Sequence, residues 1–192
     1  MTDILRITTE FVEVEDRLRL TCALRSGDTA VLWLTQRLFL RMLPHLLEWL
    51  DAHTPGLGAA TPTREQADEL RSFSQQAARA TQAQEPPVSA QSAAQIWLAH
   101  TVELQPRGGE LRLIFRPAAR DAAAGSLVLA PQPLRVWLGI VAEQFARAGW
   151  PLEVWPGWLR PGGTSTGGSV AGQAAEPAAG QPPGGTPGAV VH

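Results

Sequence analysis

The side chains that most often carry chemistry are few and widely spaced in this sequence. The histidines are residues 45, 53, 100 and 192, and only the first two fall on one predicted helix. His45 and His53 would lie about 12 Å apart along the helix axis, too far to share a metal ion. Cys22 is the single cysteine, which excludes an internal disulfide and a multi-cysteine metal site. The sequence therefore predicts no metal site and no cofactor.

The carboxylates that could serve as a general acid or base are Glu48, Asp51 and Glu143. Each falls on the polar side of a predicted helix, away from the apolar stripe, which is typical of a solvated face. No serine, cysteine and histidine stand at a spacing that would activate a nucleophile. The pattern predicts a protein that is not an enzyme.

Charge and composition argue against a partner that is recognised at long range. All 16 basic residues are arginine, and the formal net charge is −2. A nearly neutral chain has no long-range field for nucleic acid or for an anionic membrane. The sequence contains no lysine, asparagine or tyrosine. Because the codons for those residues are AT-rich, this composition indicates a GC-rich, bacterial genome.

A set of arginines nonetheless recurs on the outward phase of the predicted strands in both halves of the chain. If the halves joined one sheet, these side chains could line a groove for single-stranded nucleic acid. The stacking aromatics that such sites use are missing from the same phase. Glutamates also lie among the arginines, which favours cross-strand ion pairs on a solvated face. Nucleic-acid binding is therefore the alternative function, with the candidate residues Arg17, Arg19, Arg25, Arg107, Arg112 and Arg116.

Tryptophan provides another candidate site. Trp150, Trp155 and Trp158 lie in a short segment with two prolines that follows the last predicted helix. Trp150 is expected to cover the core. Trp155 and Trp158 bracket a Pro-Gly pair and are expected to contact a partner, because tryptophan is enriched at interface hot spots. Trp49, on the first long helix, is assigned to the same partner-binding role.

The elements that must position these residues follow from hydrophobic periodicity. Apolar spacing predicts three strands and then a helix, over residues 4–14, 17–25, 30–34 and 36–52. The alternation slips near Phe11-Val12, which predicts a bulge or a register change there. Thr35 is a natural N-cap for the helix. Pro44 lies inside it and predicts a kink or a break, because proline has no N–H to donate.

Residues 54–95 are predicted to link two similar halves. This linker holds a helix rich in glutamine and alanine over 63–83, with Thr63 and Gln66 as a capping box. The apolar stripe of this helix is thin. We therefore expect the helix to skim the body of the domain.

The second half repeats the order of the first. Three strands and a helix are predicted over residues 96–105, 110–116, 126–130 and 132–149. Leu98, Val102 and Leu104 are expected to share the inward phase of the first strand. Val12-Glu13-Val14 matches Val102-Glu103-Leu104, and Leu18-Arg19-Leu20 matches Leu111-Arg112-Leu113. This repetition predicts an internal duplication, and leaves open whether the halves share one sheet.

The sequence as a whole predicts an α+β protein built from duplicated β-β-β-α halves, with helices packed on antiparallel sheet. The first half is predicted at residues 1–53 and the linker at 54–95. The second half, with the tryptophan-rich segment, is predicted at 96–160. A disordered tail rich in Gly, Pro and Ala is predicted at 161–192. No signal peptide or transmembrane segment is evident, so the cytoplasm is expected. We interpret the chain as a non-catalytic bacterial accessory or scaffold protein that binds another protein, or itself as a homodimer.

Overall fold

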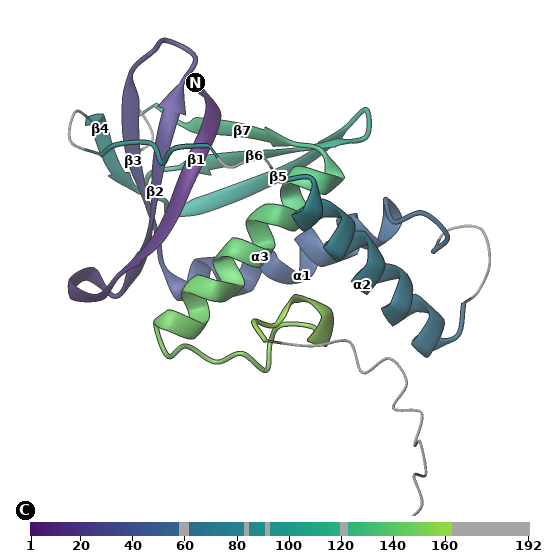
Figure 1. Ribbon diagram of the computed structural model, residues 1–192. Coiled ribbons are helices and arrows are strands. Elements are labelled where there is room, and N and C mark those ends of the chain that lie inside the picture. The colour runs from purple at the N-terminus through teal and green to yellow at the C-terminus, as the bar shows by residue number, and fades with distance from the viewer. Residues whose placement is uncertain (58–61, 83–84, 91–92, 120–122, 163–192) are drawn as a thin grey trace, which may run out of the picture.

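The chain folds as an α+β protein with a seven-stranded mixed sheet and three helices packed on it (Figure 1). The computed structural model describes residues 1–57, 62–82, 85–90, 93–119 and 123–162. The α+β prediction is confirmed. The predicted disorder of the C-terminal tail falls almost wholly outside the described residues.

The elements follow the predicted order closely. The strands are β1 to β7, at Thr2–Val12, Arg17–Leu24, Thr29–Leu34, Ala93–Leu98, Thr101–Arg107, Glu110–Arg116 and Gly125–Leu129. The helices are α1 to α3, at Gln36–Ala52, Arg64–Ala80 and Pro131–Arg147. Short 3-10 turns, η1 and η2, occur at Glu13–Glu15 and Gly157–Leu159.

The two halves share one sheet, which answers the question that the sequence left open. The strand order is β4-β3-β2-β1-β7-β6-β5. Pairing within each half is antiparallel, as predicted, whereas β1 pairs with β7 and β3 pairs with β4 in parallel. The sheet is therefore mixed. β1, which opens the first half, pairs with β7 of the second half, and β4, which opens the second half, pairs with β3 of the first half.

The two ends of the strand order are consecutive pieces of one stretch of chain. Only Ala99 and His100 separate β4 from β5. The Ala99 N–H donates to the carbonyl of Trp33 at 2.9 Å, and the His100 N–H donates to the carbonyl of Arg116 at 2.7 Å. The chain thus passes from the first half of the sheet to the second at this junction, and the sheet curves round on itself (Figure 1).

The strand registers align the two halves residue by residue. Leu18 pairs with Leu34 and Leu111 pairs with Leu129, in each case the last residue of the strand that precedes a helix. The predicted match of Leu18-Arg19-Leu20 with Leu111-Arg112-Leu113 is therefore confirmed. In both halves the outer leucines are buried and the arginine between them is half-buried.

The predicted match of residues 12–14 with residues 102–104 is wrong. Ile7 pairs with Cys22 and Val102 pairs with Phe115, at equivalent positions of β2 and β6. Residues 7–9 are therefore the counterparts of 102–104. The slip near Phe11-Val12 is not a bulge but the end of β1, where η1 begins. The register shift in β1 lies between Ile4 and Arg6 instead.

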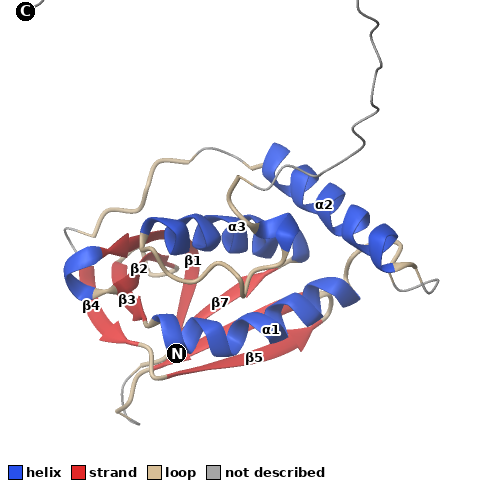
Figure 2. Ribbon diagram, turned by 90° about the horizontal axis from the view of Figure 1, so that it is seen from below, coloured by secondary structure: helices blue, strands red, loops and turns tan. Residues whose placement is uncertain are grey.

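Helix ends agree with the capping signals in the sequence. The Thr35 hydroxyl accepts from the Leu38 N–H at 3.2 Å. Thr63 and Gln66 form the predicted capping box. α1 continues through Pro44 from Gln36 to Ala52, so the break allowed for at that proline does not occur. α1 and α3 lie side by side against the sheet, whereas α2 packs on α3 (Figure 2).

Cys22 lies in the core, as its inward phase predicts, and burial raises the pKa of its thiol from 9.0 to about 12. We expect the folded protein at pH 8 to react with a thiol reagent on the order of 1,000-fold more slowly than the unfolded chain. The unfolded thiol ionises above pH 9, whereas the folded thiol stays protonated to about pH 12. The contribution of Cys22 to the free energy of unfolding is therefore full below pH 9 and falls as the pH rises. Labelling with and without urea measures the rate difference, and similar rates would contradict it.

None of the helices in the described part of the chain is long and apolar enough to cross a membrane.

Candidate partner-binding surface

The structure places two of the predicted contact tryptophans in the interior. Trp155 is 1% exposed and Trp49 is 8% exposed. Trp155 stacks on Phe39 with ring centroids 5.6 Å apart, and it meets Phe145 edge-on at 5.2 Å. Their assignment to a partner-binding surface is therefore wrong, because both rings belong to the hydrophobic core. The sequence could not separate the two roles, since a large aromatic suits a core and an interface equally.

Trp158 lies nearer the surface than Trp155, and Trp150 is about as buried as Trp49. Trp150 packs edge-on against Phe11 and Phe145, and its indole N–H donates to Asp16 Oδ1 at 3.0 Å, so it covers the core as expected. Trp158 is half-buried, and its ring lies 5.3 Å from the Arg135 guanidinium carbon. One face of Trp158 is therefore already occupied by a cation–π contact.

Four of the six arginines proposed for nucleic-acid binding form ion pairs with carboxylates. Arg19 pairs with Glu10, and Arg116 pairs with Glu103, in each case across neighbouring strands. The hydrogen bond from Arg116 lowers the pKa of Glu103 below its ordinary value. Arg17 and Arg25 pair with Glu15 and Asp3. Arg107 and Arg112 have no ion-pair partner among the described residues.

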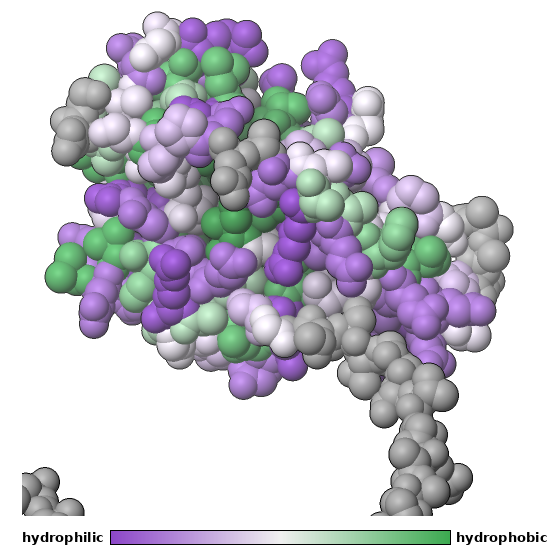
Figure 3. Space-filling view, in the orientation of Figure 1, coloured by the Kyte–Doolittle hydropathy of each residue, from purple (hydrophilic) through white to green (hydrophobic). Residues whose placement is uncertain are grey.

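These ion pairs neutralise most of the positive charge with which the six arginines could bind a phosphate backbone. Hydrophilic and apolar residues are interspersed across the face of the molecule seen in Figure 3. The cross-strand ion pairs that the sequence favoured are thus present on a solvated sheet face.

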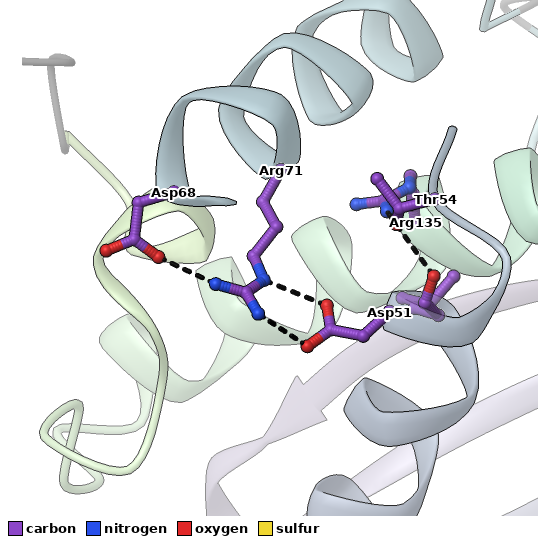
Figure 4. Close-up of polar contacts among 6 residues, drawn as sticks. Asp51, Thr54, Asp68, Arg71 and Arg135 are labelled. Atoms are coloured by element: carbon purple, nitrogen blue, oxygen red, sulfur yellow. Dashed lines mark hydrogen bonds and ion pairs between the residues drawn. The ribbon is translucent and has the colours of Figure 1, made fainter. Parts of the chain in front are cut away.

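A polar cluster joins the three helices (Figure 4). The Arg71 guanidinium on α2 donates to both carboxylate oxygens of Asp51 on α1, at 2.9 and 2.8 Å, and to Asp68 at 2.9 Å. The hydrogen bond to Asp51 raises the pKa of Arg71. Asp51 is therefore a structural partner of Arg71. The other two carboxylates considered for acid–base chemistry, Glu48 and Glu143, are exposed on their helices.

Arg135 is the most deeply buried charge in the described part of the chain. It is 3% exposed, one guanidinium nitrogen donates to the hydroxyl of Thr54, and Nη1 has no hydrogen-bond partner. Burial lowers its pKa, opposed by the negative charge of Asp51. Its contact with Thr54 joins α3 to the end of α1.

An exposed apolar surface, which the sequence did not reveal, lies on the outer side of β3 and β4. Ile96 is 67% exposed and Leu98 is 40% exposed, and Leu98 pairs directly with half-buried Trp33. We call Trp33, Ile96 and Leu98 the β3–β4 face. Leu98 was expected on the inward phase with Val102 and Leu104. That expectation is wrong, because the junction at 99–100 interrupts the strand and resets its alternation.

The equivalent outward position in the first half is charged. Ile96 pairs with Val31 and Asp3 pairs with Ser126, and both partners lie three residues before the end of their strand. Asp3 forms an ion pair with Arg25 at 3.7 Å. An isoleucine at the matching site is therefore not a requirement of the shared fold.

A groove of about 800 Å³ lies beside β1, between the sheet, the N-terminal half of α3, the end of α2 and residues 85–87. Its apolar lining includes Leu127, Val136 and Ile140. We call this cavity the β1 groove. Its lining is Leu5, Arg6, Ile7, Thr8, Thr9, Ala78, Thr81, Gln82, Glu85, Pro86, Pro87, Leu127, Leu129, Gln132, Pro133, Val136, Trp137 and Ile140.

Within the described ranges, His, Cys, Asp and Glu side chains nowhere gather in a group of three or more that could hold a metal ion. Searches against protein-family models, curated proteins and solved structures found no match to this chain.

Proposed function

We propose that the chain is a non-catalytic accessory or scaffold protein of the bacterial cytoplasm that acts by binding another protein. The observation that supports this proposal is the β3–β4 face. Ile96 and Leu98 expose apolar side chains on a strand at one end of the strand order, so the far edge of β4 has no strand neighbour among the described residues. An exposed apolar edge strand is a ready surface for pairing with a second chain.

The polar groups fit this proposal better than they fit catalysis. Asp51, Arg71 and Arg135 are engaged in contacts that hold the helices together. A catalytic site would need convergent polar groups with free hydrogen-bonding capacity in a pocket. The β1 groove instead has a mainly apolar lining.

The test compares two substitutions at similarly exposed apolar residues. Ile96→Glu places a charge in the β3–β4 face, whereas Phe73→Glu changes α2, where the ring is 71% exposed. We expect both variants to keep the Tm of the parent chain within a few degrees, because neither side chain is buried. Tagged full-length chains are then used to capture partners from lysate of the native organism. A stoichiometric protein retained by the parent and by Phe73→Glu, but lost with Ile96→Glu, supports the proposal.

Equal capture by Ile96→Glu and the parent would refute a role for the β3–β4 face. Light scattering on the purified chains covers the case in which the partner is a second copy. A parent dimer that becomes a monomer in Ile96→Glu assigns the face to self-association.

Binding of single-stranded nucleic acid is the second candidate, and the ion pairs weigh against it. With four of six arginines paired, we expect elution of the chain from a polyanion column at low salt. The double variant Arg19→Ala, Arg112→Ala should elute at the same salt concentration. Strong retention that falls steeply with salt, and is lost in the double variant, would instead favour nucleic acid.

A further inference from the structure

We infer that the β1 groove binds an extended, uncharged apolar segment of another protein, which adds to the free edge of β1 as a short strand. This inference rests on the proposed function only in that the ligand is a protein. It concerns a different surface from the β3–β4 face, so the two can be tested separately.

The groove exists because the parallel ladder between the halves is short. β1 pairs with β7 only at Thr2, Asp3 and Ile4, although β1 continues to Val12. Beyond the pair of Ile4 with Leu127 the two strands separate. α3 begins at Pro131, shortly after β7, and lines the opening between β1 and β7.

The edge of β1 that faces this opening carries free backbone groups. The Phe11 N–H donates to Gln144 Oε1 at 2.9 Å, so the backbone of Phe11 points away from β2. Backbone direction alternates along a strand, and Thr9 and Ile7 therefore point to the same side. Neither has a backbone hydrogen-bond partner on that side among the described residues. Two free pairs of N–H and C=O groups, two residues apart, are what an added strand requires.

The second half differs at one position of the equivalent edge. Pro106 pairs with Leu111 as Phe11 pairs with Leu18, so Pro106 occupies the place of Phe11. Proline has no N–H, and it is one of the residues that keep an edge strand from pairing further. The first half instead has Phe11, whose N–H is satisfied by a side chain of α3. Val102 and Leu104, the counterparts of Ile7 and Thr9, also lie on a strand edge, but no residue of β5 lines the groove.

The lining defines the chemical class of the segment. Arg6 and Glu85 are the charged residues of the groove within the described ranges, and they pair with each other at 2.6 Å. The remaining residues are apolar or carry hydroxyl and amide groups. A charged side chain would find no free counter-ion in the groove, which favours apolar residues alternating with small polar ones. The volume of about 800 Å³ lies within the range of about 300 to 1,000 Å³ that ligand sites occupy.

The test uses three end-capped heptapeptides that alternate Val with Thr, Ile with Ser, and Leu with Thr. Binding to the full-length chain is followed by the amide NMR signals of residues 5–11. We expect at least one peptide to shift the signals of Ile7 and Thr9 and to slow their hydrogen exchange. N-methylation of the central residues removes the N–H groups that pair with β1, and should weaken binding about five- to tenfold.

Two substitutions separate this site from the proposed function. Val136→Glu places a charge in the lining of the groove and should abolish peptide binding, whereas Leu98→Glu on the β3–β4 face should leave it unchanged. No shift at Ile7 or Thr9 with any peptide at 1 mM, or equal affinity for the N-methylated peptide, would overturn the inference. In that case, partner capture that depends on Ile96 would still leave the proposed function standing. Peptide binding without such capture would support the β1 groove as a binding site and would exclude the β3–β4 face as the partner-binding surface.

Discussion

Replacing Trp155 with alanine is expected to lower the free energy of unfolding by about 3 to 5 kcal/mol, the usual cost of deleting a buried aromatic ring. The ring is fully enclosed and contacts Phe39 and Phe145. Together with Trp150 and Leu159, it holds the segment after α3 against the core. Without it the cavity and the lost aromatic contacts both act against folding. Urea denaturation followed by circular dichroism measures the change.

Trp158→Ala is the matched control for this prediction. Trp158 lies three residues further along, is half-buried and faces Arg135. Because part of its surface is already in water, its removal should cost about 1 to 2 kcal/mol. Similar losses for the two variants would contradict the assignment of Trp155 to the core.

The second large effect is expected at the contact between Thr54 and Arg135. Thr54→Val keeps the shape of the side chain but removes the acceptor for the buried guanidinium and the hydroxyl that donates to the Leu50 carbonyl at 2.7 Å. Hydrogen bonds to charged groups are worth about 1.5 to 3 kcal/mol. We expect the free energy of unfolding to fall by about 2 to 3 kcal/mol, measured by urea denaturation at pH 7.

Arg135→Met should behave differently. Methionine has a similar length and needs no hydrogen-bond partner, and Arg135 has no direct carboxylate contact to lose. Replacing a buried charge with an apolar residue is often neutral or stabilising. The double variant with Thr54→Val should therefore be more stable than Thr54→Val alone. A double variant that is less stable than either single change would show that the guanidinium stabilises the fold through other contacts.

Local features of the fold were predictable because they depend on local sequence. Alternating leucines around Arg19 and Arg112 predicted β2 and β6, and the threonines at positions 35 and 63 predicted the starts of α1 and α2. Each signal acts over a few residues, where steric and hydrogen-bonding preferences dominate. The parallel contacts between the halves join residues more than sixty positions apart, and alternation carries no information about such pairing.

The candidate surfaces were harder to predict than the elements. Trp155 and Trp158 have the same residue type and neighbourhood, yet one is enclosed and the other is half-buried. Leu98 is apolar and has the same alternation phase as Val102 in the sequence. The two junction residues between them interrupt that alternation, so the two side chains lie on opposite faces of the sheet. The β1 groove depends on where two distant strands separate, and that position follows from the tertiary fold alone.

The pairing of strands between the two halves has a consequence for folding. Neither half can complete its own sheet, because β1 needs β7 and β3 needs β4. Each half on its own would expose two unpaired edges together with the apolar side of its helix. The chain should therefore unfold in one cooperative step, and two separately made halves should acquire stable structure only when they are mixed.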